Sequence, residues 1–193
     1  MNCKSCSSTK NTSILDLGDH PWCNDFLPKD GVGKEQKYPL HLVHCDECEL
    51  LQLDYVVPKE VMFKNHTYVL STTDSLSEHF YDLALQNKTQ FNLKKDDLVL
   101  DIGGNDGTQL LQYKKVGIEN VLNVESADNI AELSVAAGIP TINDFFNEDL
   151  IIRENLEGKV KLINASGVFF NLEELHSVIR GIKKALTEDG VLV

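Results

Sequence analysis

The sequence predicts an α/β protein built on a mostly parallel, doubly wound sheet, with a small module in front of it. Three observations support this prediction. Strand-like and helix-like segments alternate from residue 97 onward, a glycine-rich turn follows the first of these strands, and two C-x-x-C pairs occur near the N-terminus. We therefore expect an N-terminal module over residues 1–60, a connecting segment over 61–92 and the main domain over 93–193.

The composition is that of a globular protein with an acidic surface. Of the 193 residues, 42% are hydrophobic, and 30 acids against 18 bases give a net charge of -12. This charge repels a phosphate backbone, so we expect no nucleic-acid partner. No stretch approaches the roughly 18 apolar residues of a membrane span, and the N-terminus has no apolar signal region. We expect a cytoplasmic protein that does not enter a membrane.

The two C-x-x-C pairs predict a structural zinc site. The pairs are CKSC and CDEC, and in a reducing compartment such spacing favours metal binding over a disulfide. Four thiolates form a closed tetrahedral site, with Cys3, Cys6, Cys45 and Cys48 as the ligands. The alternative is a set of reactive or merely buried cysteines. Cys23 stands alone in HPWCND, and we expect it to be a packed thiol.

The connecting segment carries a polar strip followed by a helix. His66, Tyr68, Ser71 and Thr72 lie within a few residues of one another, and apolar residues at helical spacing follow in SLSEHFYDLALQNKTQFNL. The strip has two interpretations. It is a solvated linker, or it lines a substrate cleft.

The main domain is predicted element by element. DLVLDIG is a buried strand, TQLLQYKKVG a helix, NVLNVES a second strand and NIAELSVAAG a second helix. A short strand at 141–142, a helix near 147–155, a strand KVKLINAS, a helix LEELHSVIRGIKKAL and a final strand VLV complete the pattern. In such sheets ligands bind at the carboxyl ends of the strands.

The turn IGGNDG therefore marks a candidate cofactor site. Gly103, Gly104 and Gly107 allow positive φ and close approach of the backbone to a ligand. The spacing is G-G-x-x-G, whereas a dinucleotide fingerprint is G-x-G-x-x-G, and Asp106 inside the turn would repel a pyrophosphate. S-adenosylmethionine carries a sulfonium and an ammonium group and suits an acidic turn better. A NAD-dependent Rossmann-type enzyme and a turn without any ligand are the alternatives.

Taken together, these motifs resemble the sugar C-methyltransferases that act on nucleotide-linked keto-deoxysugars. The resemblance spans essentially the whole chain and is carried by CKSC, LDLGDHPWCNDF, YPLHLVHCDECELLQL, HTYVLSTTDS, DIGGNDGTQLL, NVES and AAGIPTINDFF. It implies a class I methyltransferase fold, S-adenosylmethionine as cofactor, a structural zinc ion and a small-molecule nucleotide-sugar substrate.

The resemblance also implies roles for individual residues. Glu125 would bind the ribose of the cofactor. The adenine would contact Asn143, Asp144 and Phe145, and the methionine part would contact the turn, at Asp101, Gly103, Asn105, Asp106 and Gly107, with Gly104 allowing close approach.

The chemistry implied by the resemblance is removal of a proton beside a ketone, followed by attack of the enolate on the sulfonium methyl. Such a reaction needs a general base and donors aimed at the developing oxyanion. Tyr68 and His66 are the expected catalytic residues, and Ser71 and Thr72 the expected sugar contacts.

The sequence departs from the family pattern at three places. His66 replaces the first tyrosine of a Y-x-Y motif, and Asn171 stands where the family carries a histidine. The chain ends at Val193, inside the fifth strand, so we expect a class I fold without its last two strands. The alternative function is then a catalytically inactive, zinc-stapled module that binds S-adenosylmethionine. An exposed sheet edge would favour self-association.

Overall fold

The computed structural model describes residues 1–23, 26–169 and 173–193. The chain divides into two compact units, Met1–Met62 and Phe63–Val193, which are described separately. Among the described residues, no helix is both long and apolar enough to cross a membrane.

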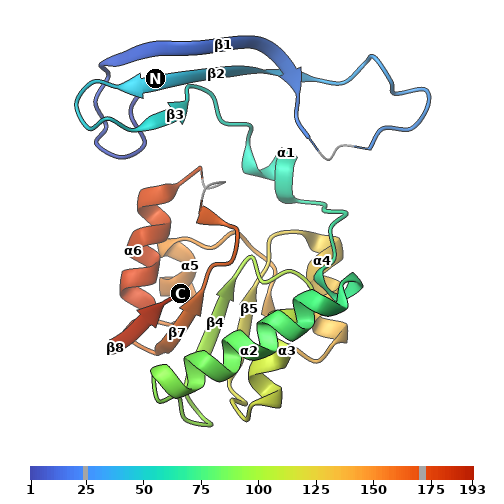
Figure 1. Cartoon of the computed structure of the whole chain (residues 1–193), viewed down its shortest axis with the longest axis vertical. Helices are drawn as coiled ribbons and strands as arrows, with labels where there is room; N and C mark the ends of the chain where they lie inside the picture. Colours follow the sequence, from blue (N-terminus) through green and yellow to red (C-terminus); the bar gives the residue numbers. More distant parts are fainter. Residues whose placement is uncertain (24–25, 170–172) are drawn as a thin grey trace. The chain divides into compact units, whose positions relative to one another are not determined.

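The first unit is a three-stranded antiparallel sheet with a small core. Its strands are β1 (Asn11–Pro21), β2 (Lys37–Cys45) and β3 (Leu51–Leu53), in the order β1-β2-β3 (Figure 1). The short helix α1 (Lys59–Phe63) follows the sheet. Nearly all of β1 is exposed, and a module with so little buried apolar surface needs a further stabilising element, such as a metal ion.

The second unit alternates helices and strands. In chain order, its elements are the 3-10 helix η1 (Leu70–Thr72), α2 (Asp74–Gln90), β4 (Leu98–Ile102), α3 (Thr108–Lys115), β5 (Val121–Val124), α4 (Asp128–Ala136), β6 (Thr141–Ile142), α5 (Glu148–Arg153), β7 (Val160–Asn164), α6 (Leu175–Ala185) and β8 (Leu186–Leu192).

These strands form one sheet in the order β6-β5-β4-β7-β8. Every neighbouring pair is parallel. The chain thus starts in the middle of the sheet, moves outward to one edge and then returns to build the other side. This doubly wound topology confirms the fold class that the sequence predicts, and the reversal between β4 and β7 creates a crevice at the carboxyl ends of the strands.

The sheet has a buried layer on each face because successive side chains of a strand point to opposite sides. Leu100 packs with residues of α5 and α6, whereas its neighbour Val99 packs with residues of α2 and α3. Figure 1 shows these helices covering the sheet. By this alternation Asp101 lies on the side of α3, at the end of the central strand.

Strand β8 is longer than the predicted VLV and is irregular. Val160 lies opposite Leu186, but Leu162 lies opposite Val191, so the intervening residues of β8 bulge out of the ladder. Within this bulge an added Cβ at Gly190 would lie 3.0 Å from the carbonyl oxygen of Val160. The close backbone approach explains why a glycine stands here.

Candidate cofactor and metal sites

The turn between β4 and α3 adopts the conformations that its residue types favour. Gly103 and Gly107 have φ values of 65° and 80°, and Asn105 has a φ of 52°. Positive φ is easiest for glycine and is next best tolerated by asparagine and aspartate. The turn thereby places a short run of backbone at the carboxyl end of the central strand.

Gly104 is required for a different reason, because its surroundings leave no room for a side chain. A Cβ atom built at Gly104 would lie 2.5 Å from Oδ1 of Asn123 and 2.9 Å from Cβ of Asp101. At Gly103 it would lie 2.9 Å from a methyl group of Val168. Gly103 and Gly104 are therefore required by the close packing of the turn against the side chains of Val168, Asn123 and Asp101.

Asn123 on β5 supports this turn and is a site residue that the sequence reasoning missed. It is fully buried. Its Oδ1 accepts from the N–H of Gly104 at 3.1 Å, and its Nδ2 donates to the carbonyl of Asn105 at 2.8 Å and to Oγ of Ser134 at 3.0 Å. A polar residue inside the otherwise apolar parallel strand VLNV is the signal that could have identified it.

Asp101 is a buried carboxylate with an unused oxygen. Asp101 is only 1% exposed, and its Oδ2 has no hydrogen-bond partner among the described residues. Burial and the nearby Glu125 raise the pKa of Asp101 well above its ordinary value. A buried acid with an unpartnered oxygen fits a ligand that brings a cationic group or hydrogen-bond donors.

Glu125 lies directly after β5 and is held by backbone donors. Oε2 accepts from the N–H of Asn105 at 2.9 Å, and Oε1 accepts from the N–H of Ala127 at 2.8 Å. Burial outweighs these bonds and raises the pKa of Glu125. Each oxygen keeps further acceptor capacity, which suits a pair of ligand hydroxyl groups.

The carboxylate of Asp106 accepts hydrogen bonds at the start of α3 and from the segment before α2. Its Oδ1 accepts from the N–H and the hydroxyl of Thr108 at 3.1 and 2.7 Å, and its Oδ2 accepts from the N–H of Ser71 at 2.9 Å. Burial by itself raises the pKa of Asp106, but the donors of Ser71 and Thr108 outweigh it and lower the pKa. Asp106 is thus a buried, ionised group that links the start of α3 to the segment that contains Ser71.

The predicted catalytic residues lie on a segment that reaches this turn. The side chain of Asn105 donates to the carbonyl of Tyr68 at 3.0 Å, and the N–H of Tyr68 donates to Nδ1 of His66 at 3.2 Å. The two rings meet edge to face, with centroids 6.4 Å apart. Tyr68 is 53% exposed, so it is accessible from solvent.

The remaining predicted residues divide into two groups. Asn143 is brought to the site, because its Nδ2 donates to the carbonyl of Glu125 at 3.0 Å. Thr72 and Asp144 make other contacts: the hydroxyl of Thr72 donates to the carbonyl of Val69, and Asp144 pairs with Arg153 at 2.7 Å. Phe145 follows Asp144 and is partly buried. Asn171 lies outside the described residues.

The four predicted zinc ligands meet in the first unit. Their sulfur atoms all lie within 4.8 Å of one another, and the Cys3–Cys48 and Cys6–Cys45 sulfur distances are both 3.6 Å. A tetrahedral zinc ion with bonds of about 2.3 Å to sulfur spaces its ligands about 3.8 Å apart. The donor set and its spacing therefore fit zinc.

Each C-x-x-C pair sits in the same kind of turn. The residues that follow the pairs, Ser7 and Glu49, have φ values of 64° and 63°. In each turn the N–H of this residue donates to the carbonyl of the first cysteine, at 2.9 Å from Ser7 to Cys3 and at 2.9 Å from Glu49 to Cys45. The two turns are thus preorganised to direct two sulfurs each toward one point. Cys23, by contrast, is exposed, so the expectation of a packed thiol was wrong.

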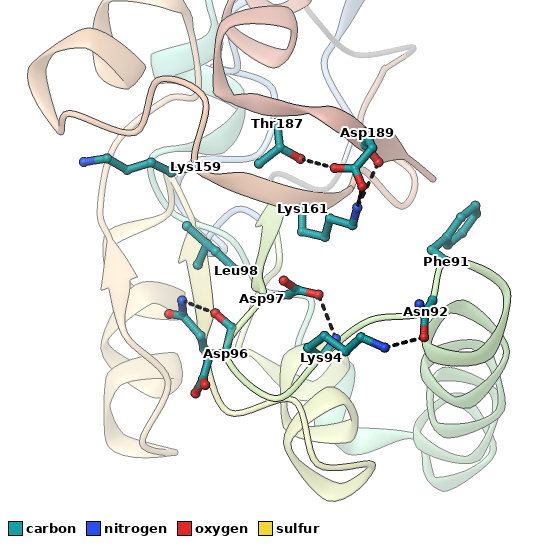
Figure 2. Close-up of a pocket in the computed structure, with 11 residues that line it drawn as sticks. Phe91, Asn92, Lys94, Asp96, Asp97, Leu98, Lys159, Lys161, Thr187 and Asp189 are labelled. Carbon is teal, nitrogen blue, oxygen red and sulfur yellow. Dashed lines mark hydrogen bonds and ion pairs between the residues drawn. The ribbon is translucent and has the colours of Figure 1, made fainter.

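A separate pocket lies at the opposite end of the sheet, near the residues where the strands begin (Figure 2). Its volume is about 520 Å³, and its lining mixes lysines with aspartates. Lys161 forms an ion pair with Asp189 across it. None of the predicted site residues lines this pocket.

Comparisons with known proteins support both units. Residues 3–63 match a family model described as "Putative zinc binding domain". Over 194 aligned residues the chain is 27% identical to the C-methyltransferase NovU of Streptomyces niveus, and the match covers 98% of this chain and 45% of that protein. The chain therefore spans less than half the length of this relative.

Solved structures identify the fold of the second unit. A "putative" S-adenosyl-L-methionine-dependent methyltransferase from Methanococcus maripaludis matches with a TM-score of 0.50 and 15% identity, over 64% of this chain and 60% of that chain. The cyclase SpnF matches with a TM-score of 0.50 and 13% identity, over 58% of this chain and 43% of that chain. The second unit has the class I methyltransferase fold, and the cyclase shows that this fold alone does not select a reaction.

Proposed function

We propose that this protein is a zinc-containing, S-adenosylmethionine-dependent C-methyltransferase, for which this chain supplies the cofactor site and the zinc module. The observation that carries the proposal is Asp101, buried with an unpartnered oxygen beside the glycine turn of a class I methyltransferase fold. The similarity to a C-methyltransferase along nearly the whole chain supports transfer to carbon.

Different residues in and around the turn would contact different parts of the cofactor. Asp101 would face the ammonium group of the methionine part, and the backbone at Gly103 and Gly104 would lie against it. Glu125 would accept the ribose hydroxyls. Asn143, whose side chain donates to the carbonyl of Glu125, would contact the adenine. When bound, S-adenosylmethionine supplies an electrophilic methyl group.

A nucleotide-linked keto-deoxysugar is the substrate class that we propose, with an enolate formed beside its ketone. Tyr68 and His66 would together remove the proton and stabilise the oxyanion, since their rings meet on one segment beside the turn and Tyr68 is exposed. Ser71 and Thr72 would contact the sugar, and both are exposed.

Binding of the cofactor is the first test. Calorimetry with S-adenosylhomocysteine should show binding to the parent protein and at least about tenfold weaker binding to Asp101→Ala and Glu125→Ala, the loss of roughly 1.4 kcal/mol. Asp96→Ala, at the opposite end of the sheet, is the control. Absence of binding to the parent, or equal binding by all variants, would refute the cofactor assignment.

Proton removal can be tested apart from methyl transfer. If the enolate forms, a nucleoside diphosphate-linked keto-deoxysugar incubated with the protein in D₂O should incorporate deuterium beside the ketone, and Tyr68→Phe should slow this exchange. Transfer of labelled methyl from S-adenosylmethionine then tests the complete reaction. A protein that binds the cofactor but does neither is the inactive, zinc-stapled module.

The structure also bears on the NAD-dependent alternative. A pyrophosphate in the turn would approach Asp106, which is 4% exposed and whose donors lower its pKa, so it stays ionised. Repulsion between these charges in a buried site disfavours a dinucleotide. Stabilisation of the protein against thermal unfolding by NAD, and not by S-adenosylhomocysteine, would reverse this conclusion.

Self-association is a further part of the proposal. β8 forms one edge of the five-stranded sheet, and Leu192 and Val193 are 45% and 43% exposed. An exposed edge offers unpaired backbone groups to a second copy. Light scattering should show concentration-dependent dimers, and a monomer at all concentrations would exclude this contact.

A further inference from the structure

Residues 64–71, which we call the strap, are attached to the second unit mainly through side chains of other elements. Before η1 the strap has no regular secondary structure. At its start the carbonyl of Lys64 accepts from the N–H of Asp128, and the two side chains form an ion pair at 2.8 Å. Three further side chains then hold it along its length.

Two of these side chains are asparagines that bind the backbone of the strap. Asn129 of α4 accepts from the N–H of His66 at 3.0 Å and donates to the carbonyl of the same residue at 2.7 Å. Asn105 of the turn accepts from the N–H of Leu70 at 3.0 Å and donates to the carbonyl of Tyr68 at 3.0 Å. An amide side chain carries both N–H donors and an acceptor oxygen, so it can replace the hydrogen bonds that a neighbouring strand would make.

The third side chain is Asp106, which accepts from the N–H of Ser71. All three therefore fix the path of the backbone, while the ring of Tyr68 remains exposed. The anchoring hydrogen bonds thus fix the position of Tyr68 and leave its side chain free for other contacts.

Asn105 belongs to the strap contact and to the cofactor turn at the same time. While its side chain holds the strap, its N–H donates to Glu125 and its carbonyl accepts from Asn123. Asn105 makes both sets of bonds in a left-handed conformation, with a φ of 52°. A ligand that stabilises this conformation of the turn also stabilises the anchor of the strap.

We propose that Asn105 and Asn129 are positioning residues that couple occupancy of the cofactor turn to the position of the strap. This inference rests on the proposed function, since it assigns the strap to the same site. Cofactor binding holds the strap in place, and by linkage an anchored strap strengthens cofactor binding by the same factor.

Hydrogen exchange on the parent protein is the first measurement. The amides of His66, Leu70 and Ser71 donate to side chains of the three anchors, so their exchange reports the strap directly. Addition of S-adenosylhomocysteine should slow exchange at all three amides, including His66, whose anchor lies on α4 and not in the turn.

Asn129→Ala removes one anchor at an exposed position outside the turn. We expect faster exchange across the strap and S-adenosylhomocysteine binding about 5- to 30-fold weaker, with little change in thermal stability without ligand. Asn129→Asp keeps the acceptor for the N–H of His66 and should recover part of the affinity. Asn120→Ala, which removes an exposed side-chain bond to the carbonyl of Asp96, is the matched control.

The outcomes separate the two proposals. If the parent does not bind S-adenosylhomocysteine, the cofactor assignment fails and the coupling falls with it. If the parent binds it but exchange in the strap does not change, or Asn129→Ala binds it as the parent does, the coupling is refuted and the cofactor assignment stands.

Discussion

Asp101 and Asn164 lie opposite each other on the neighbouring strands β4 and β7, and each has a buried polar atom that finds no partner among the described residues. The atoms are a carboxylate oxygen of Asp101 and the amide nitrogen of Asn164. Native proteins pair nearly all such groups. Their position beside the glycine turn indicates a polar site that a ligand or an ordered water completes.

Replacing Asp101 by asparagine should stabilise the ligand-free protein at neutral pH. Because the pKa of Asp101 is raised in the folded state, the protonated form favours folding, and this contribution is lost as the pH rises through the folded pKa. The advantage of Asp101→Asn over the parent should therefore grow with pH in urea unfolding between about pH 5 and 8. A variant that is less stable than the parent throughout this range would contradict the assignment.

Replacing Asn123 by alanine should destabilise the fold. The change leaves the N–H of Gly104 and the carbonyl of Asn105 without their buried partner, at a cost of about 1 to 3 kcal/mol for an unsatisfied group. Urea unfolding measures the loss. At the exposed Asn120 the same substitution should change stability by less than about 0.5 kcal/mol, and equal effects at both sites would argue against this role for Asn123.

Replacing Gly104 by alanine should also be costly, and for a steric reason. The new Cβ would overlap Oδ1 of Asn123 and atoms of Asp101, and forced repacking costs about 1 to 3 kcal/mol. Thermal unfolding should show a lower midpoint and calorimetry a weaker affinity for S-adenosylhomocysteine. Gly138→Asn is the comparison, because Gly138 has open space and asparagine tolerates its positive φ. An unchanged midpoint for Gly104→Ala would show that Asp101 and Asn123 are not tightly packed against Gly104.

Replacing Cys45 by serine should release the metal. Elemental analysis should find about one zinc ion per chain in the parent and in Cys23→Ser, but much less in Cys45→Ser. Because metal binding and folding are coupled, Cys45→Ser should also expose the first unit to proteolysis. Equal zinc content in all three proteins would exclude the four-cysteine site.

The sequence predicted the sheet because local and global signals agree there. Residues 98–102 are apolar except for Asp101, and a glycine turn follows. The next two helices, α3 and α4, each end beside a glycine with positive φ, Gly117 and Gly138. Periodicity and turn chemistry are local properties, so they can be found without coordinates.

The contacts that assemble the site were harder to predict. Asn123 and Asn129 bind backbone atoms of distant segments. Because nearly all residue types carry the same backbone groups, the sequence of the distant segment does not reveal such a contact. Asp106 accepts hydrogen bonds from Ser71 and Thr108, and the sequence did not predict these contacts. Which of several polar groups turns inward depends on packing between elements, which a linear pattern does not contain.

The metal site has a consequence for the entropy of the unfolded chain. Cys6 and Cys45 are 39 positions apart, so an ion held by both pairs closes a loop around β1 and most of β2. By the chain-entropy relation for cross-links, a loop of this size disfavours the unfolded state by about 4 kcal/mol. The ion would thus act as a cross-link that survives only while the thiolates stay reduced, which makes the rigidity of the first unit dependent on zinc supply and redox state.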